Sequence, residues 1–203
     1  MPKFDDLILS VSSFNPSLVM VTESWLTDSM ISGLFEIPNF CFYRQDRRDR
    51  KGGGVCLWVS DRIRSSLHLS THNPPSYCEF LFVNPQLDSH KIICCVIYIP
   101  PGLCKEQHRE ISDFIVSEID HVHSSNPHLN IIIAGDFNDF PCASLEEALA
   151  LKNKVNVATR MDSILDKIFV DTDLSDYFDE FAVPSQIRRG HRQQVSPLRC
   201  AAR

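Results

Sequence analysis

Acidic and amide side chains follow apolar runs at several points of this sequence. The segment Ile131–Asn138 reads IIIAGDFN, so Asp136 and Asn138 stand two residues apart just after three isoleucines. Residues two apart in an extended segment project to the same side, so we expect this carboxylate and amide to face one site. The carboxylate could accept a proton from water, and the amide could donate to a phosphoryl oxygen. The pair predicts phosphate-ester hydrolysis, although a polar turn explains the same letters.

Four other side chains stand at or near the ends of expected strands or in a basic segment. Glu23 follows an apolar run, Tyr98 lies near the end of another, and Asp166 lies within a third. His191 lies in a basic stretch near the C-terminus. Alone, each has an ordinary interpretation as a solvated or core residue. A carboxylate such as Glu23 would suit Mg²⁺, which takes few carboxylates and several waters.

Alternating and continuous apolar patterns predict the elements that must position these side chains. Helices are expected over residues 4–14, 106–122 and 144–151. Strands are expected over residues 18–22, 40–43, 55–59, 79–83, 92–99, 131–134 and 164–170. The strands outnumber the helices and are mostly sequential. The pattern therefore predicts a single α/β sandwich domain over residues 1–203, with helices packed outside two sheets.

Composition excludes several classes of protein. The 203 residues are 43% hydrophobic and 23% charged, as in ordinary globular domains. Neither a membrane-spanning run nor a secretory leader is visible, so we expect an intracellular protein, nuclear or cytoplasmic, that is not secreted and uses no membrane. We also expect a monomer. The eight cysteines include no C-x-x-C pair, which favours free thiols over a zinc site.

Two basic segments could face a nucleic-acid backbone despite the net charge of −6. That charge argues against a protein that coats nucleic acid, but not against an enzyme with a local basic rim. The two segments contain Arg44, Arg47, Arg48, Arg50 and Lys51, and then Arg188, Arg189 and Arg192. An exposed, solvated loop is an equally good interpretation of each segment.

Five motifs occur in a fixed order along the chain. They are TESWL at 22–26, GGGVCLWV at 52–59, YIPPG at 98–102, AGDFN at 134–138 and LDKIF at 165–169. Together they resemble the endonuclease/exonuclease/phosphatase superfamily, and more narrowly the apurinic-type endonuclease domain of non-LTR (LINE-like) retrotransposons. The resemblance covers residues 3–197 and implies a four-layer α/β sandwich, with two mixed sheets flanked by helices. It also implies Mg²⁺- or Mn²⁺-dependent cleavage of DNA, and a reverse transcriptase domain in the parent element.

The resemblance assigns roles to the residues at the strand ends. It implies that Glu23 is a metal ligand and that Tyr98 contacts the scissile phosphate. Asp136 matches the residue that activates or orients the attacking water, close to the metal. Asn138 matches the amide that holds Asp136 and the phosphate. DNA with a nicked strand and a free 3′-hydroxyl is the implied product.

The same resemblance extends to the second half of the chain. Asp166 matches the carboxylate that orients the catalytic histidine, and His191 matches that histidine, which stabilises a phosphate oxygen. Thr159 resembles a threonine near the DNA groove.

Departures from the family pattern leave other interpretations open. The family carries an asparagine on a strand before the helix at residues 4–14, and this chain begins after that strand. Gly190 stands where the family has an aspartate, and the last strand is expected to be short or missing. The domain is therefore expected to be incomplete at both ends. A degenerate, non-catalytic remnant is one alternative, and a phosphatase acting on inositol phosphates or lipids is another.

Overall fold

A computed structural model describes residues 4–48, 51–87, 90–155, 164–174 and 194–198. The helices are α1 (Phe4–Phe14), α2 (Lys105–Ser125) and α3 (Ala143–Ala148), with a short 3-10 helix η1 (Ser32–Phe35). The strands are β1 (Leu18–Thr22), β2 (Phe40–Gln45), β3 (Val55–Ser60), β4 (Arg64–His68), β5 (Glu79–Leu87), β6 (His90–Tyr98), β7 (Asn130–Asp136), β8 (Leu151–Asn153), β9 (Asp166–Asp171) and β10 (Gln194–Leu198).

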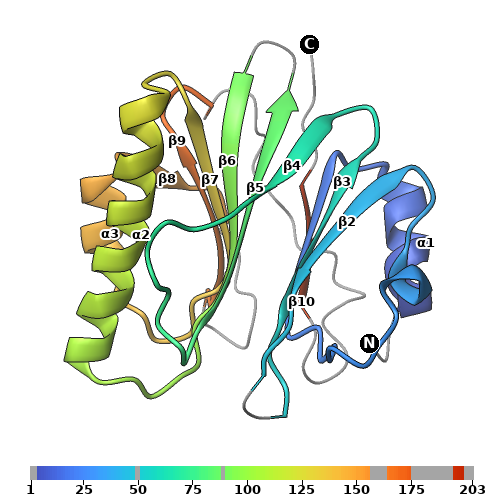
Figure 1. Ribbon diagram of the computed structural model, residues 1–203, viewed down its shortest axis with the longest axis horizontal. Helices are drawn as coiled ribbons and strands as arrows, with labels where there is room; N and C mark the ends of the chain where they lie inside the picture. Colours follow the sequence, from blue (N-terminus) through green and yellow to red (C-terminus); the bar gives the residue numbers. More distant parts are fainter. Residues whose placement is uncertain (1–3, 49–50, 88–89, 156–163, 175–193, 199–203) are drawn as a thin grey trace.

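The strands form two sheets that lie face to face (Figure 1). The smaller sheet has the order β10-β1-β3-β2, and each neighbouring pair in it is antiparallel. The larger sheet has the order β4-β5-β6-β7-β9-β8, in which β6 and β7 are parallel and the other pairs antiparallel. Helix α1 covers the outside of the smaller sheet, and α2 and α3 cover the larger one. The predicted four-layer α/β sandwich is confirmed.

The alternation of side chains along each strand divides the core into three layers. Val96 and Ile132 of the larger sheet face the smaller sheet, in a cluster that also contains Leu57. Ile93 lies three residues before Val96 on β6 and faces the other way, so it packs beneath α2 with Ile115 of that helix. Strands covered on both faces read as continuous apolar runs, which is why β6 and β7 were recognisable from sequence. Within the described ranges, no helix combines the length and apolar character needed to cross a membrane.

Short strands with few apolar residues were not expected. Strand β4 lies at an edge of the larger sheet and reads RSSLH, so it lacks a clear hydrophobic alternation. Strand β8 is three residues long and lies at the other edge. The last strand, expected to be short or missing, is present as β10 over five residues and pairs with β1. Edge strands bury one side only or are very short, so their sequences carry a weak pattern.

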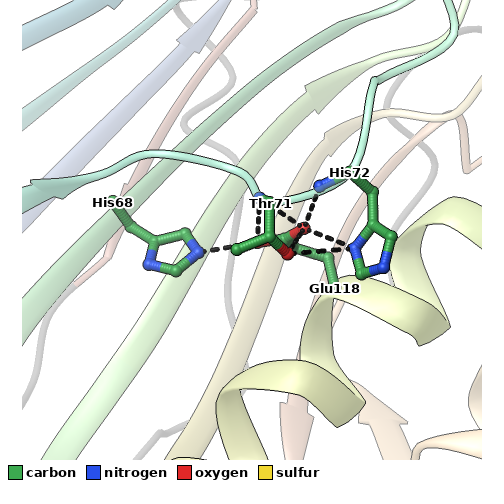
Figure 2. A network of polar contacts seen from close by, with 4 residues as sticks. All are labelled: His68, Thr71, His72 and Glu118. Carbon is green, nitrogen blue, oxygen red and sulfur yellow. Dashed lines mark hydrogen bonds and ion pairs between the residues drawn. The ribbon is translucent and has the colours of Figure 1, made fainter.

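Glu118 fastens the loop after β4 to helix α2 (Figure 2). Its carboxylate is fully buried and lies 2.8 Å from Nε2 of His68 and 3.0 Å from Nδ1 of His72. The backbone N–H and the hydroxyl of Thr71 donate to the same carboxylate. A buried carboxylate needs this many partners because leaving its oxygens without hydrogen bonds would cost several kcal/mol, on the order of 3.

This arrangement predicts a pH-dependent contribution to stability. Burial alone raises the pKa of Glu118, but the hydrogen bonds from His68, His72 and Thr71 outweigh it and lower the pKa from 4.5 to about 2. A carboxyl group with a lowered pKa in the folded state stabilises the fold above its unfolded pKa. We therefore expect this stabilisation to be full above pH 4.5 and to be lost as the pH falls toward 2.

The measurement is the free energy of unfolding in urea at several pH values. Glu118→Gln should lower it by about 2 kcal/mol at pH 7 and should flatten its fall below pH 4.5. Asp120→Asn, at an exposed position of the same helix, is the matched control and should follow the parent curve. Parallel curves for the parent and Glu118→Gln would contradict the assignment.

Candidate active site

A row of polar side chains crosses the larger sheet at one end. Glu79 on β5 is the register partner of Tyr98 on β6, Tyr98 of Asp136 on β7, and Asp136 of Asp166 on β9. Register partners project to the same face of a sheet. That face is turned toward the smaller sheet, because Ala134, two residues before Asp136, belongs to the core between the sheets. Strand pairing therefore brings Tyr98, Asp136 and Asp166 together.

Glu23 reaches the same region from the smaller sheet. It follows β1 directly, and its φ of 53° is left-handed, as is the φ of 58° at Trp25. The indole Nε1 of Trp25 donates to the Glu23 carboxylate at 2.9 Å, and the hydroxyl of Tyr98 donates to it from the larger sheet. The N–H of Trp25 also bonds to the carbonyl of Gly53 at 2.9 Å. Left-handed conformations at residues other than glycine cost on the order of 1–3 kcal/mol each and cluster at functional sites.

The turn after β7 holds Asp136 and Asn138 in a geometry that the sequence did not predict. The N–H of Asn138 donates to Oδ1 of Asp136 at 3.1 Å, and the Asn138 side-chain amide donates to the carbonyl of Ile99 at 2.7 Å. Asn138 has a left-handed φ of 46°, so the extended segment expected through it is wrong. The strand ends at Asp136 because asparagine accepts the left-handed conformation that the turn requires. Asn138 still holds Asp136, but through its backbone.

Asp166 is the first residue of β9, and its side chain is buried. His191, Thr159 and Gly190 lie outside the described residues, so their predicted roles stay predictions. Of the predicted aspartate–histidine pair, the described structure therefore contains only Asp166, which lies beside Asp136.

Tyr98 is held as a hydrogen-bond donor. Burial raises the pKa of its hydroxyl, and the hydrogen bond to Glu23 and the negative charge of Asp136 raise it further. Because all three effects favour the neutral phenol, Tyr98 keeps its proton at neutral pH. A protonated hydroxyl can donate to a phosphate oxygen but cannot act as a base there.

The carboxylates suit a hard divalent cation. Glu23 and Asp136 both lie beside Tyr98, one from each sheet. Within the part of the chain that the structure describes, no group of three or more His, Cys, Asp and Glu side chains is placed to hold a metal. Mg²⁺ needs only one or two carboxylates and completes its shell with water and substrate phosphate, whereas structural zinc requires four protein ligands. The donor set fits Mg²⁺ or Mn²⁺.

Arg44 and Arg47 form ion pairs that the sequence did not reveal. Nη2 of Arg44 lies 3.3 Å from Asp46, and Arg47 pairs with Glu79 through two hydrogen bonds. The side chains of Arg44 and Arg47 are 17% and 10% exposed, so neither serves as part of a solvated loop or an open basic rim. The expectation of a rim is wrong for these two residues. Glu79 is 32 positions from Arg47, so no local pattern could have paired them.

Solved structures with the same fold include phosphate-ester hydrolases. The endonuclease domain of TRAS1, a telomere-specific non-LTR retrotransposon, matches with a TM-score of 0.64 and 14% identity over 97% of this chain and 92% of that chain. The human Nocturnin catalytic domain matches with a TM-score of 0.63 and 12% identity over 96% of this chain and 85% of that chain. An endonuclease/exonuclease/phosphatase family protein from Bacteroides thetaiotaomicron gives 0.62 and 12% over 84% and 74%.

No protein-family model matches the chain, and no curated protein sequence matches it significantly. At these identities the matches establish the fold. The chain has the fold of the endonuclease/exonuclease/phosphatase proteins, and the resemblance predicted from the five motifs is confirmed at that level.

Proposed function

We propose that this domain is a divalent-metal-dependent endonuclease of the non-LTR retrotransposon type, which hydrolyses phosphodiester bonds in DNA. The observation that carries the proposal is the meeting of Glu23 from one sheet with Tyr98, Asp136 and Asp166 from the other. The similarity to the TRAS1 endonuclease domain supports the choice of DNA as substrate. Residues 1–203 would act as one monomeric domain on DNA, in the nucleus or cytoplasm, within an element that also encodes a reverse transcriptase.

The proposed reaction is an in-line attack of water on the scissile phosphorus. The new P–O bond forms as the opposite bond to the 3′-oxygen breaks, and the leaving oxygen takes up a proton from solvent to become the free 3′-hydroxyl. Asp136, held by the N–H of Asn138, orients the water and accepts its proton. The hydroxyl of Tyr98, which donates to Glu23 in this structure, would turn its one proton to a non-bridging phosphate oxygen, on which negative charge increases. Mg²⁺ or Mn²⁺ held by Glu23 and Asp136 would supply positive charge that neutralises the phosphate. Following the resemblance, Asp166 orients His191, which donates to another phosphate oxygen.

Nicking of supercoiled plasmid tests the proposal. We expect conversion to the open circle with Mg²⁺ or Mn²⁺ and none after EDTA is added. Glu23→Gln should lower the nicking rate about 100-fold at limiting Mg²⁺, with partial recovery at higher concentrations, because one metal ligand is weakened. Glu36→Gln, at an exposed position outside the site, is the matched control and should nick like the parent.

The outcomes separate the three interpretations. A folded parent that does not nick at high enzyme concentration would instead be a non-catalytic remnant. Release of inorganic phosphate from inositol or sugar phosphates without nicking would favour a phosphatase, as in the mannosyl-6-phosphatase from Bacteroides thetaiotaomicron, which shares the fold with a TM-score of 0.60. Nicking by the parent and Glu36→Gln, with loss in Glu23→Gln, would support the endonuclease.

A further inference from the structure

Arg47 and Glu79 form a buried ion pair that the proposed reaction does not use. Nε and Nη2 of Arg47 donate to the two carboxylate oxygens of Glu79, the second at 2.8 Å. The two side chains are only 10% and 6% exposed. Removing two charges from water costs as much as their attraction returns, so a buried pair is a weak source of stability. Its forked geometry instead fixes the position of the guanidinium group.

The guanidinium group is fixed over the ring of Tyr98. Cζ of Arg47 lies 5.1 Å from the ring centroid, within range of a cation–π interaction. Glu79 is the cross-strand register partner of Tyr98, so the carboxylate that anchors Arg47 stands beside the ring. The Tyr98 ring is therefore packed against the Arg47 guanidinium group, which Glu79 ties to the larger sheet.

The same guanidinium group also packs against the turn that positions Glu23. A Cβ atom added to Gly53 would lie 2.3 Å from Cζ of Arg47, so the group fills the space beside this glycine. The carbonyl of Gly53 accepts from the N–H of Trp25, whose indole in turn donates to Glu23. Arg47 thus contacts Tyr98 on the larger sheet and the Gly53 turn of the smaller sheet.

We propose that Arg47, anchored by Glu79, is a positioning residue that sets the placement of the Tyr98 hydroxyl relative to the Glu23 carboxylate. This inference rests on the proposed function and assigns Arg47 no contact with substrate. The planar fork is essential, because it bonds both oxygens of Glu79 while its face stays on the ring. A lysine in the same place would keep the charge but could not hold both contacts.

Kinetics of plasmid nicking provide the first test. Arg47→Met and Arg47→Lys should each lower kcat about 100-fold and change KM little, because a displacement of about 1 Å at a reacting group has that effect. Glu79→Gln frees the guanidinium group without removing it and should have a smaller effect of the same kind. Arg44→Met removes the neighbouring ion pair and leaves the buried Asp46 carboxylate unpaired, so it should lower stability. As the matched control it should stay within about twofold of the parent in kcat, because the pair that it removes is not the one that holds the guanidinium group over Tyr98.

A double-mutant cycle separates positioning from general damage. In a Tyr98→Ala background, Arg47→Met should cause little further loss, because the group that it positions has been removed. Losses that multiply to the full product of the two single variants would overturn the inference. Circular dichroism melts identify any variant that has unfolded. If an Arg47 variant is unfolded, Glu79→Gln replaces it in the same cycle with Tyr98→Ala.

A spectroscopic test is independent of activity. In protein labelled with 3-fluorotyrosine, the Tyr98 resonance is assigned by its absence in Tyr98→Phe. We expect it to shift or broaden in Arg47→Lys and in Glu79→Gln, and to stay unchanged in Arg44→Met. An unchanged resonance in the first two variants would overturn the inference whatever the activity. If the resonance moves in Arg47→Lys and Glu79→Gln but the parent does not nick, the proposed function is overturned. The placement of Tyr98 by Arg47 is still supported in that case.

Discussion

Replacing Asp136 by asparagine is expected to slow nicking about 1000-fold, in the range that loss of a positioned general base produces. The amide keeps the size of the carboxyl group, and its oxygen can still accept the N–H of Asn138, which lies 3.1 Å from Oδ1 in the parent. What it loses is the ability to accept a proton from the attacking water and a negative charge beside the metal. Single-turnover nicking with saturating Mg²⁺ measures the change, and the melting temperature should remain within a few degrees.

Asp173→Asn is the control for this substitution. Asp173 lies just after β9 and is exposed, so its loss of charge leaves the site untouched. We expect it to nick at the parent rate. A rate for Asp136→Asn equal to that of Asp173→Asn would contradict the role of Asp136 in handling the water, provided that Glu23→Gln lowers the rate and so rules out a contaminating nuclease.

Gly135→Ala is expected to lower the free energy of unfolding by about 3 kcal/mol, the upper part of the usual range for single substitutions. A Cβ atom at this position would lie 1.8 Å from the carbonyl oxygen of Ile97 on β6. Because that oxygen belongs to the backbone, the strain can be relieved only if β6 and β7 move apart. These two strands carry Tyr98 and Asp136, so nicking should fall together with stability. Urea denaturation and the nicking rate are the two measurements.

Ala134→Gly provides a matched comparison for Gly135→Ala. Ala134 is fully buried on the same strand, and its replacement adds backbone freedom without introducing a clash. We expect a loss of about 1 kcal/mol from that freedom. If Gly135→Ala were no more destabilising than Ala134→Gly, close contact between the strands would not be the reason for glycine at this position.

Elements that depend on local patterns were predictable from the sequence. Helix α1 and strand β1 begin and end where their apolar periodicity does. Strands β6 and β7 are buried on both faces, so their sequences are nearly continuous apolar runs that only a central strand explains. The polar residues at strand ends could be singled out from the sequence, but alone each had an ordinary interpretation. Glu23, Tyr98 and Asp136 received their predicted roles only from the resemblance carried by the five motifs in order.

Contacts between distant segments were decided by tertiary structure. Asp136 and Asp166 became neighbours through the register of β7 and β9, and Arg47 met Glu79 across 32 positions of sequence. Glu118 likewise bonds His68 across 50 positions. Such pairs leave no periodic signal, because a strand register depends on packing over its whole length.

The local sequence was therefore enough to identify Asp136 as a candidate residue at the end of a buried strand. Which groups surround Asp136, and the left-handed turn that directs Asn138 toward Ile99, were set by the folded chain. The physical reason is that apolar periodicity depends only on which face of one segment is buried. Hydrogen bonds and ion pairs depend on which distant segments pack together, and this is not visible in either segment alone.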